Sequence, residues 1–130
     1  MTARILMVDD EPDAQELFRQ NFRHEIRKGV YAFDFAMSGE AALNVLRGQK
    51  APPLVVLVLS DINMPGMTGI ELLAEIRKVW PAVSVFMITA YGDKATEAKA
   101  RDLGAKRFLT KPIDFGCLKQ DLAQMLEDIA

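Results

Sequence analysis

Hydrophobic residues gather in five short runs along the chain, and each run predicts a β-strand. The runs cover residues 3–8, 31–37, 54–60, 83–88 and 107–110. The third is aliphatic from Leu54 to Leu59, as expected for a strand buried on both faces of a sheet. In the second, large side chains alternate with smaller or polar ones, which predicts a strand at the sheet edge.

Amphipathic helices are predicted after each strand. In the first helix, apolar residues recur at helical spacing and are expected in the core: Ala14, Leu17, Phe18, Phe22 and Ile26. Ser38 is placed to cap the second helix, and Thr68 with Glu71 predicts a capping box for the third. The fourth, residues 94–103, carries mainly small alanines and is expected to pack weakly. The last begins near Asp114.

The order of these elements predicts the fold class. Strand and helix alternate five times over 130 residues, with no internal repeat or interdomain linker. This length suits one domain with a real core and is short for two. Regular alternation predicts parallel strands joined by right-handed crossovers, with helices on both faces. We therefore expect one doubly wound α/β domain over residues 1–130.

Composition narrows the classes of function. Sixteen basic and 18 acidic residues give a net charge of −2, which argues against nonspecific nucleic-acid binding. Cys117 is the only cysteine, so no internal disulfide can form, which suits a reducing cytoplasm. Asp9 and Asp10 interrupt the first apolar run too early for a signal peptide. No run approaches the roughly 18 apolar residues of a membrane span.

Chemistry-bearing residues follow the predicted strands. Asp9 and Asp10 follow the first strand, and Asp61 follows the third. Thr89 ends the fourth and Lys111 follows the fifth. Parallel sheets of this class bind ligands at the carboxyl ends of their strands, where the winding reverses. Three carboxylates, a hydroxyl and a lysine at that edge predict a site for a phosphoryl group and a divalent metal ion.

Four sequence motifs in order carry a family resemblance. They are residues 5–12 (ILMVDDEP), 60–69 (SDINMPGMTG), 87–90 (MITA) and 103–112 (LGAKRFLTKP). Together they resemble the receiver domain of bacterial two-component response regulators over almost the whole chain. The resemblance implies a flavodoxin-like (βα)5 sandwich with strand order 2-1-3-4-5. It also implies a cis Lys111-Pro112 peptide bond.

The resemblance assigns roles to the strand-end residues. Asp61 would accept a phosphoryl group from a sensor histidine kinase or a phosphotransfer protein. Mg²⁺ would be held by Asp10, Asp61 and the backbone carbonyl of Asn63, with Asp9 acting through a bound water. Lys111, the Thr89 hydroxyl and the backbone amide of Ala90 would stabilise the phosphoryl oxygens.

The resemblance also implies a switch. Thr89 would move toward the phosphoryl group and let Phe108 rotate inward, which changes the face formed by the fourth helix, fifth strand and fifth helix. Phe108 has no hydroxyl, so the inward position should be populated before phosphorylation. An output domain or a partner would dock on that face. Tyr91 is expected to shield the phosphoryl group from water.

Several alternatives stay open at this stage. The chain is expected to be a cytoplasmic phosphoacceptor that catalyses its own phosphorylation and dephosphorylation, rather than a turnover enzyme. It would carry no output domain, bind no nucleic acid directly and span no membrane. The alternative is a degenerate receiver that acts only as a protein-interaction module. A flavodoxin-like FMN protein needs a Ser/Thr/Gly phosphate loop after the first strand, and a haloacid-dehalogenase-type phosphatase needs an Asp-x-Asp pair there. Asp9-Asp10-Glu11 fits neither pattern.

One charged feature lies outside this site. Arg19, Arg23 and Arg27 recur at i, i+4 and i+8 of the first predicted helix, and His24 lies among them. Such a stripe is typical of a solvated face near a helix C-terminus. Docking of a kinase near the first helix is the alternative interpretation.

Overall fold

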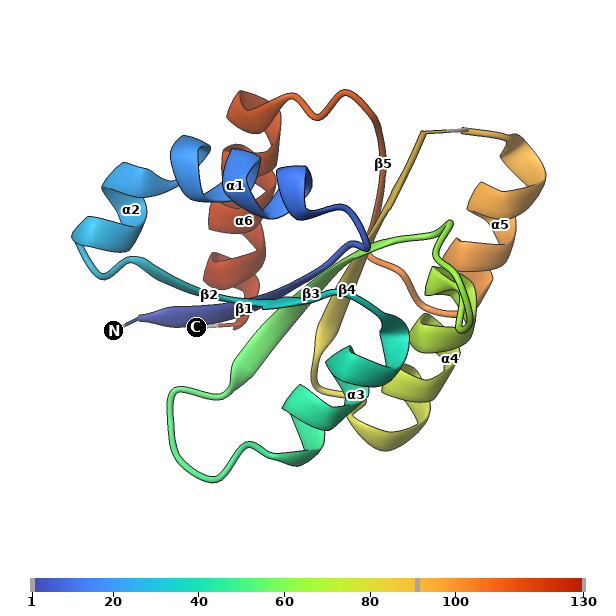
Figure 1. Cartoon of the computed structure of the whole chain (residues 1–130), viewed down its shortest axis with the longest axis horizontal. Coiled ribbons are helices and arrows are strands. Elements are labelled where there is room, and N and C mark those ends of the chain that lie inside the picture. Colours follow the sequence, from blue (N-terminus) through green and yellow to red (C-terminus); the bar gives the residue numbers. More distant parts are fainter. Residues whose placement is uncertain (1, 91, 130) are drawn as a thin grey trace.

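Five parallel strands form a single sheet at the centre of the molecule (Figure 1). The computed structural model describes residues 2–90 and 92–129, the last two of these by backbone alone. The strands are β1 (Ala3–Val8), β2 (Tyr31–Ala36), β3 (Val55–Asp61), β4 (Ser84–Thr89) and β5 (Arg107–Thr110). Their spatial order is β2-β1-β3-β4-β5, and every neighbouring pair is parallel. The predicted fold class and strand order are confirmed.

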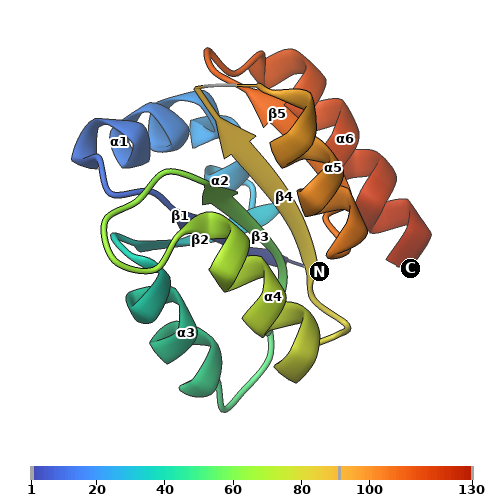
Figure 2. The same cartoon turned by 90° about the vertical axis from the view of Figure 1, so that its right-hand side faces the viewer.

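Helices cover both faces of this sheet (Figures 1 and 2). One face carries α1 (Pro12–Asn21), α2 (Arg23–Arg27) and α6 (Phe115–Ile129). The other carries α3 (Gly39–Arg47), α4 (Gly69–Val79) and α5 (Lys94–Asp102). Each face has its own hydrophobic cluster, because successive residues of a strand point to opposite sides. Two helices, α1 and α2, precede β2, so the fourth and fifth predicted helices are α5 and α6. The surface predicted to change on phosphorylation therefore consists of α5, β5 and α6, and we call it the α5-β5-α6 face.

The predicted helix caps are present. The Ser38 hydroxyl accepts a hydrogen bond from the Ala41 amide at 3.1 Å and begins α3. Thr68 and Glu71 form the reciprocal capping box of α4, with bonds of 3.0 and 3.2 Å. Within α5, Ala100 is the single buried residue, which confirms its weak packing. These contacts fix where the helices begin relative to the strand ends.

The first predicted helix is not continuous. Its backbone breaks at Phe22 (φ −107°, ψ 14°), which separates α1 from α2. Phe18 and Phe22 are buried as expected, whereas Leu17 is 48% exposed and Ile26 is 38% exposed, so their predicted burial is wrong. The break seats the Phe22 ring among Phe18, Tyr31 and Phe33 and leaves Ile26 on the surface.

Two further details concern the strands. β3 begins at Val55, one residue later than predicted, and Asp61 is its last residue; Leu54 is exposed. β2 lies at the sheet edge, as predicted, and its Asp34 pairs with Arg4 of β1 at 2.6 Å. Among the described residues, none of the helices is long and apolar enough to cross a membrane.

Candidate phosphoryl and metal site

Neighbouring strand ends bring three carboxylates together. Val8, the last residue of β1, lies opposite Ser60 of β3, so Asp9 and Asp61 follow side by side. Asp9, Asp10 and Asp61 each offer a carboxylate oxygen, and these oxygens lie within 4.8 Å of one another. The structure thus brings together the three acids that sequence analysis singled out.

Backbone amides hold two of these carboxylates in place. Asp9 is 1% exposed, and its Oδ1 accepts a hydrogen bond from the Glu11 amide at 2.9 Å. Asp61 is 5% exposed, and the Asn63 amide donates to its Oδ1 at 3.4 Å. The backbone therefore turns directly after β1 and directly after β3. These turns hold the two carboxylates at the edge of the sheet.

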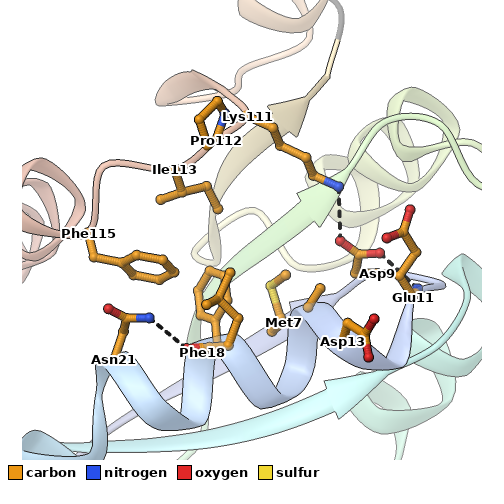
Figure 3. Close-up of a pocket in the computed structure, with 12 residues that line it drawn as sticks. Met7, Asp9, Glu11, Asp13, Phe18, Asn21, Lys111, Pro112, Ile113 and Phe115 are labelled. Atoms are coloured by element: carbon orange, nitrogen blue, oxygen red, sulfur yellow. Dashed lines mark hydrogen bonds and ion pairs between the residues drawn. The ribbon is translucent and has the colours of Figure 1, made fainter.

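Lys111 supplies the positive charge opposite these acids. Its Nζ lies 3.0 Å from Asp61 Oδ2 and 3.3 Å from Asp9 Oδ2, and Figure 3 shows the side chain reaching from the loop after β5 toward Asp9. Its backbone amide donates to the Thr89 carbonyl at 2.8 Å, which anchors the loop to β4. The Lys111-Pro112 peptide bond is cis, as the resemblance implied.

Burial and charge shift the pKa values of two members of this cluster. Burial raises the pKa of Asp9 above its ordinary value and the nearby Asp61 adds to this, whereas the Glu11 amide and Lys111 oppose it. Burial alone would lower the pKa of Lys111, but its hydrogen bonds and charge pairs with Asp61 and Asp9 outweigh burial and raise it.

The direction of each shift fixes its effect on stability. The raised pKa of Asp9 means that its stabilising contribution is present at acid pH and is lost as pH rises through that pKa. Ionised Asp9 thus lowers stability at neutral pH. The raised pKa of Lys111 means that its contribution persists at neutral pH and is lost only in alkali. The negative charges of Asp9 and Asp61 thus face one positive charge, that of Lys111. A second cation would lower the repulsion between the two carboxylates.

The residues present fit a divalent metal ion. Three clustered carboxylates, two of them buried, offer hard oxygen ligands, and a single lysine leaves their charge in excess. Asp10 is partly exposed, so an ion held here could keep several waters, as Mg²⁺ prefers. The acid cluster is thus chemically suited to Mg²⁺.

Mg²⁺ should stabilise the folded domain, because the unfolded chain has no preformed cluster of acids. At a Mg²⁺ concentration ten times the dissociation constant, the gain is about 1.4 kcal/mol. Thermal unfolding at increasing MgCl₂ checks this, with matched NaCl to separate general screening. Asp10→Ala should remove the increment, whereas Asp13→Ala, which removes a nearby acid outside the cluster, should keep it. An unchanged melting temperature in the wild type at millimolar Mg²⁺ would exclude the metal site.

Three other predicted site residues, Thr89, Ala90 and Asn63, lie at or just after the ends of β3 and β4. Thr89 ends β4 and is 1% exposed, one position beyond Ile88, which faces Asp61 across the sheet. Ala90 follows on the surface, and Asn63 lies in the exposed loop after β3. Phe108 is not in the cluster. It belongs to β5, where it pairs with Met87 of β4 and is partly buried against the hydrophobic core. Tyr91 lies outside the described residues.

Sequence reasoning missed one residue that shapes the site. Gly69 begins α4 directly against the backbone of β3, and its amide donates to the Ile62 carbonyl at 2.8 Å. A Cβ at this position would lie 2.2 Å from the Asp61 carbonyl oxygen and 2.7 Å from the Ile62 Cα. Only glycine lets the helix approach the strand end this closely. Its position beside the capping residue Thr68 was the available signal.

Ser60 occupies a buried position beside Asp61. Its hydroxyl donates to the Asp61 carbonyl at 2.9 Å, so this polar group is satisfied within the strand. A serine is therefore accommodated here without an unpaired hydroxyl.

A pocket of about 500 Å³ opens beside the acid cluster, between α1 and the loop that joins β5 to α6 (Figure 3). Asp9, Glu11 and Lys111 line its polar end. Phe18 and Phe115 line the apolar remainder, and their rings meet edge to face with centroids 5.2 Å apart. The site is thus continuous with a surface that a larger molecule can contact.

A protein-family comparison identifies the class of this domain. Residues 5–123 match the model described as the response regulator receiver domain. The chain therefore belongs to this family of phosphoacceptor signalling domains of two-component systems, which interact with histidine kinases and phosphotransfer proteins.

Individual relatives agree with this assignment. The chain is 38% identical over 128 residues to the transcriptional regulatory protein GlrR of Escherichia coli K12, covering 98% of this chain and 27% of GlrR. It thus spans about a quarter of the length of that curated relative. It is 31% identical to sporulation initiation phosphotransferase F of Bacillus subtilis 168, covering 97% of this chain and 95% of the relative.

A solved structure also resembles the fold. The response regulator protein TrrA of Thermotoga maritima, in complex with Mg²⁺ and BeF, superposes with a TM-score of 0.76 at 32% identity. The match covers 94% of this chain and 97% of TrrA.

Proposed function

We propose that this domain accepts a phosphoryl group on Asp61 with Mg²⁺ as cofactor. The observation that carries the proposal is the cluster of Asp61 with the acids Asp9 and Asp10, in which Lys111 lies 3.0 Å from Asp61. Phosphoryl transfer needs a fixed oxygen nucleophile and positive charge beside the equatorial oxygens of the phosphoryl group. Asp61 meets the first need and Lys111 the second.

The transfer proceeds by attack of an Asp61 carboxylate oxygen on the phosphorus of a phosphohistidine. The new O–P bond forms as the P–N bond breaks, and the donor histidine departs. Bound Mg²⁺ would supply positive charge to the phosphoryl oxygens. Lys111 turns from the Asp61 carboxylate to a phosphoryl oxygen, while the Thr89 hydroxyl and the Ala90 amide donate to the others. The chain's own residues thus catalyse the transfer, and water later removes the phosphoryl group.

The donor is a sensor histidine kinase or a phosphotransfer protein, and we propose that it covers the pocket between α1 and the β5–α6 loop. That pocket begins at Asp9 and Lys111, so a protein that presents a histidine to Asp61 must lie over it. Its apolar wall offers contact area beside the reacting groups.

Mass spectrometry tests the function directly. The domain is incubated with acetyl phosphate and MgCl₂, digested, and examined for a mass gain of one phosphoryl group on the peptide that contains Asp61. We expect the gain with Mg²⁺ and its loss when a chelator is added first. A domain that gains no phosphoryl group, from acetyl phosphate or from phosphoramidate, is an interaction module only.

Phosphorylation should change the α5-β5-α6 face. A dianion on Asp61 draws in the Thr89 hydroxyl, and space opens beside Phe108, which lies on the adjacent strand. Beryllofluoride, as a phosphoryl mimic, should therefore shift NMR resonances of β5 and α5 well beyond the acid cluster. Thr89→Ser keeps the hydroxyl and should preserve these shifts, whereas Thr89→Ala should abolish them. If the two variants behave alike, the hydroxyl has no part in the switch.

A further inference from the structure

The short helix α2 carries a cationic surface far from the phosphoacceptor site. It lies beside the start of β2, at the opposite end of the sheet from the loop after β1 (Figure 1). A hollow of about 310 Å³ there is lined by Gln20 and Asn21 from the end of α1 and by Arg23, His24 and Arg27 of α2. We call these five residues the α2 basic surface.

The arginines of this surface are unpaired within the part of the chain that the structure describes. Neither Arg23 nor Arg27 forms an ion pair or a side-chain hydrogen bond with another described residue. Spaced at i and i+4 on one helix, their like charges repel and destabilise α2. The repulsion would be relieved by an anion bound from outside the domain.

The acid within α2 is paired with another helix. Glu25 lies between the two arginines in sequence, yet its carboxylate pairs with Lys119 of α6 at 3.0 Å. Lys119 in turn lies over the Phe22 ring, 5.3 Å from its centroid. The acid of α2 therefore fastens the helix to α6 and pairs with neither Arg23 nor Arg27.

Exposed aliphatic residues accompany the charges. Ile26 is 38% exposed and Val30 is 42% exposed. Ile26 directly precedes Arg27 in α2, and Val30 lies three residues beyond Arg27, after the helix ends. Arginines next to exposed apolar side chains are typical of protein-protein interfaces.

We propose that the α2 basic surface docks an acidic, amphipathic segment of a partner protein. Two carboxylates spaced at i and i+4 on a partner helix would match the spacing of Arg23 and Arg27, and its apolar residues would cover Ile26 and Val30. Nucleic acid fits less well, because the cations are confined to one short helix of a chain with net charge −2. A membrane surface needs about four to eight clustered cations and would use the aliphatic pair less.

An NMR titration tests the proposal. The probe is a synthetic helical peptide in which glutamates recur at every fourth position beside leucines. We expect resonance shifts confined to residues 20–30, an affinity that falls with added NaCl, and at least tenfold weaker binding by Arg23→Ala/Arg27→Ala. The control Arg47→Ala/Lys78→Ala removes the same charge from exposed positions on the opposite face and should bind as the wild type does.

Other outcomes would overturn the proposal. These are equal binding of a peptide with glutamine in place of glutamate, and equal binding by Arg23→Ala/Arg27→Ala. A third is that the resonances of residues 20–30 shift only when duplex DNA or phosphatidylglycerol vesicles are added, and not with the peptide. Phosphorylation of Asp61 by acetyl phosphate, measured on the same double variant, should be unchanged, so the outcome is independent of the proposed phosphoacceptor function.

Discussion

Asp61→Asn is expected to abolish phosphorylation of the domain by acetyl phosphate. In the proposed transfer this carboxylate supplies the oxygen that attacks phosphorus, and an amide oxygen at the same place is a far weaker nucleophile. Mass spectrometry in the presence of Mg²⁺ should show the full mass gain in the wild type and none in the variant. Asp13→Asn, which changes an exposed acid near the same pocket, serves as the control and should phosphorylate normally.

The same substitution should raise the stability of the metal-free domain. Three clustered acids face one lysine, so removal of one buried charge relieves repulsion worth about 1 kcal/mol. Lys111 keeps Asp9 as a partner at 3.3 Å, so no cation is left unpaired. Urea unfolding without Mg²⁺ measures this. A stable, folded Asp61→Asn variant that still gains a phosphoryl group at the wild-type rate would refute the assignment of Asp61.

The positions of the five strands could be predicted from the sequence because the signals for them are local and repeated. Each predicted strand is a mainly apolar run followed by a polar or charged residue. Each of the two predicted caps joins a hydroxyl to the amide three residues later, as Ser38 does with Ala41 and Thr68 with Glu71. The carboxyl ends of parallel strands meet at one edge, so Asp9, Asp61 and Lys111 could be brought together from strand order alone. The motif resemblance supplied that order.

The features that were missed depend on contacts between distant segments. Helical spacing placed Leu17 and Ile26 in the core, but the backbone turns at Phe22 where the ring packs against residues of β2. No local pattern marks that turn, since Phe22 fits a continuous helix equally well. The closeness of Gly69 to the Asp61 backbone likewise arises only when α4 docks against β3.

Gly69→Ala should be the most destabilising small substitution in the site. The added Cβ would meet the Asp61 carbonyl oxygen at 2.2 Å and the Ile62 Cα at 2.7 Å, and both are backbone atoms, at the strand end and directly after it. Relief requires α4 or the end of β3 to shift. We expect a loss of about 2–4 kcal/mol in unfolding free energy, although alanine favours a helix over glycine by about 1 kcal/mol.

Gly66→Ala, in the loop between β3 and α4, separates steric crowding from backbone conformation. Gly66 has a φ of +74° and no atom within 4 Å of the position of a Cβ, so alanine there should cost only about 1–2 kcal/mol of left-handed strain. Urea unfolding of both variants gives the two costs.

Because the shift at Gly69 displaces the Asp61 backbone, Gly69→Ala should also slow phosphorylation by acetyl phosphate, whereas Gly66→Ala should keep most of the rate. Equal stability of Gly69→Ala and the wild type would mean that α4 is free to move away from the strand end, and that the glycine does not set the position of Asp61.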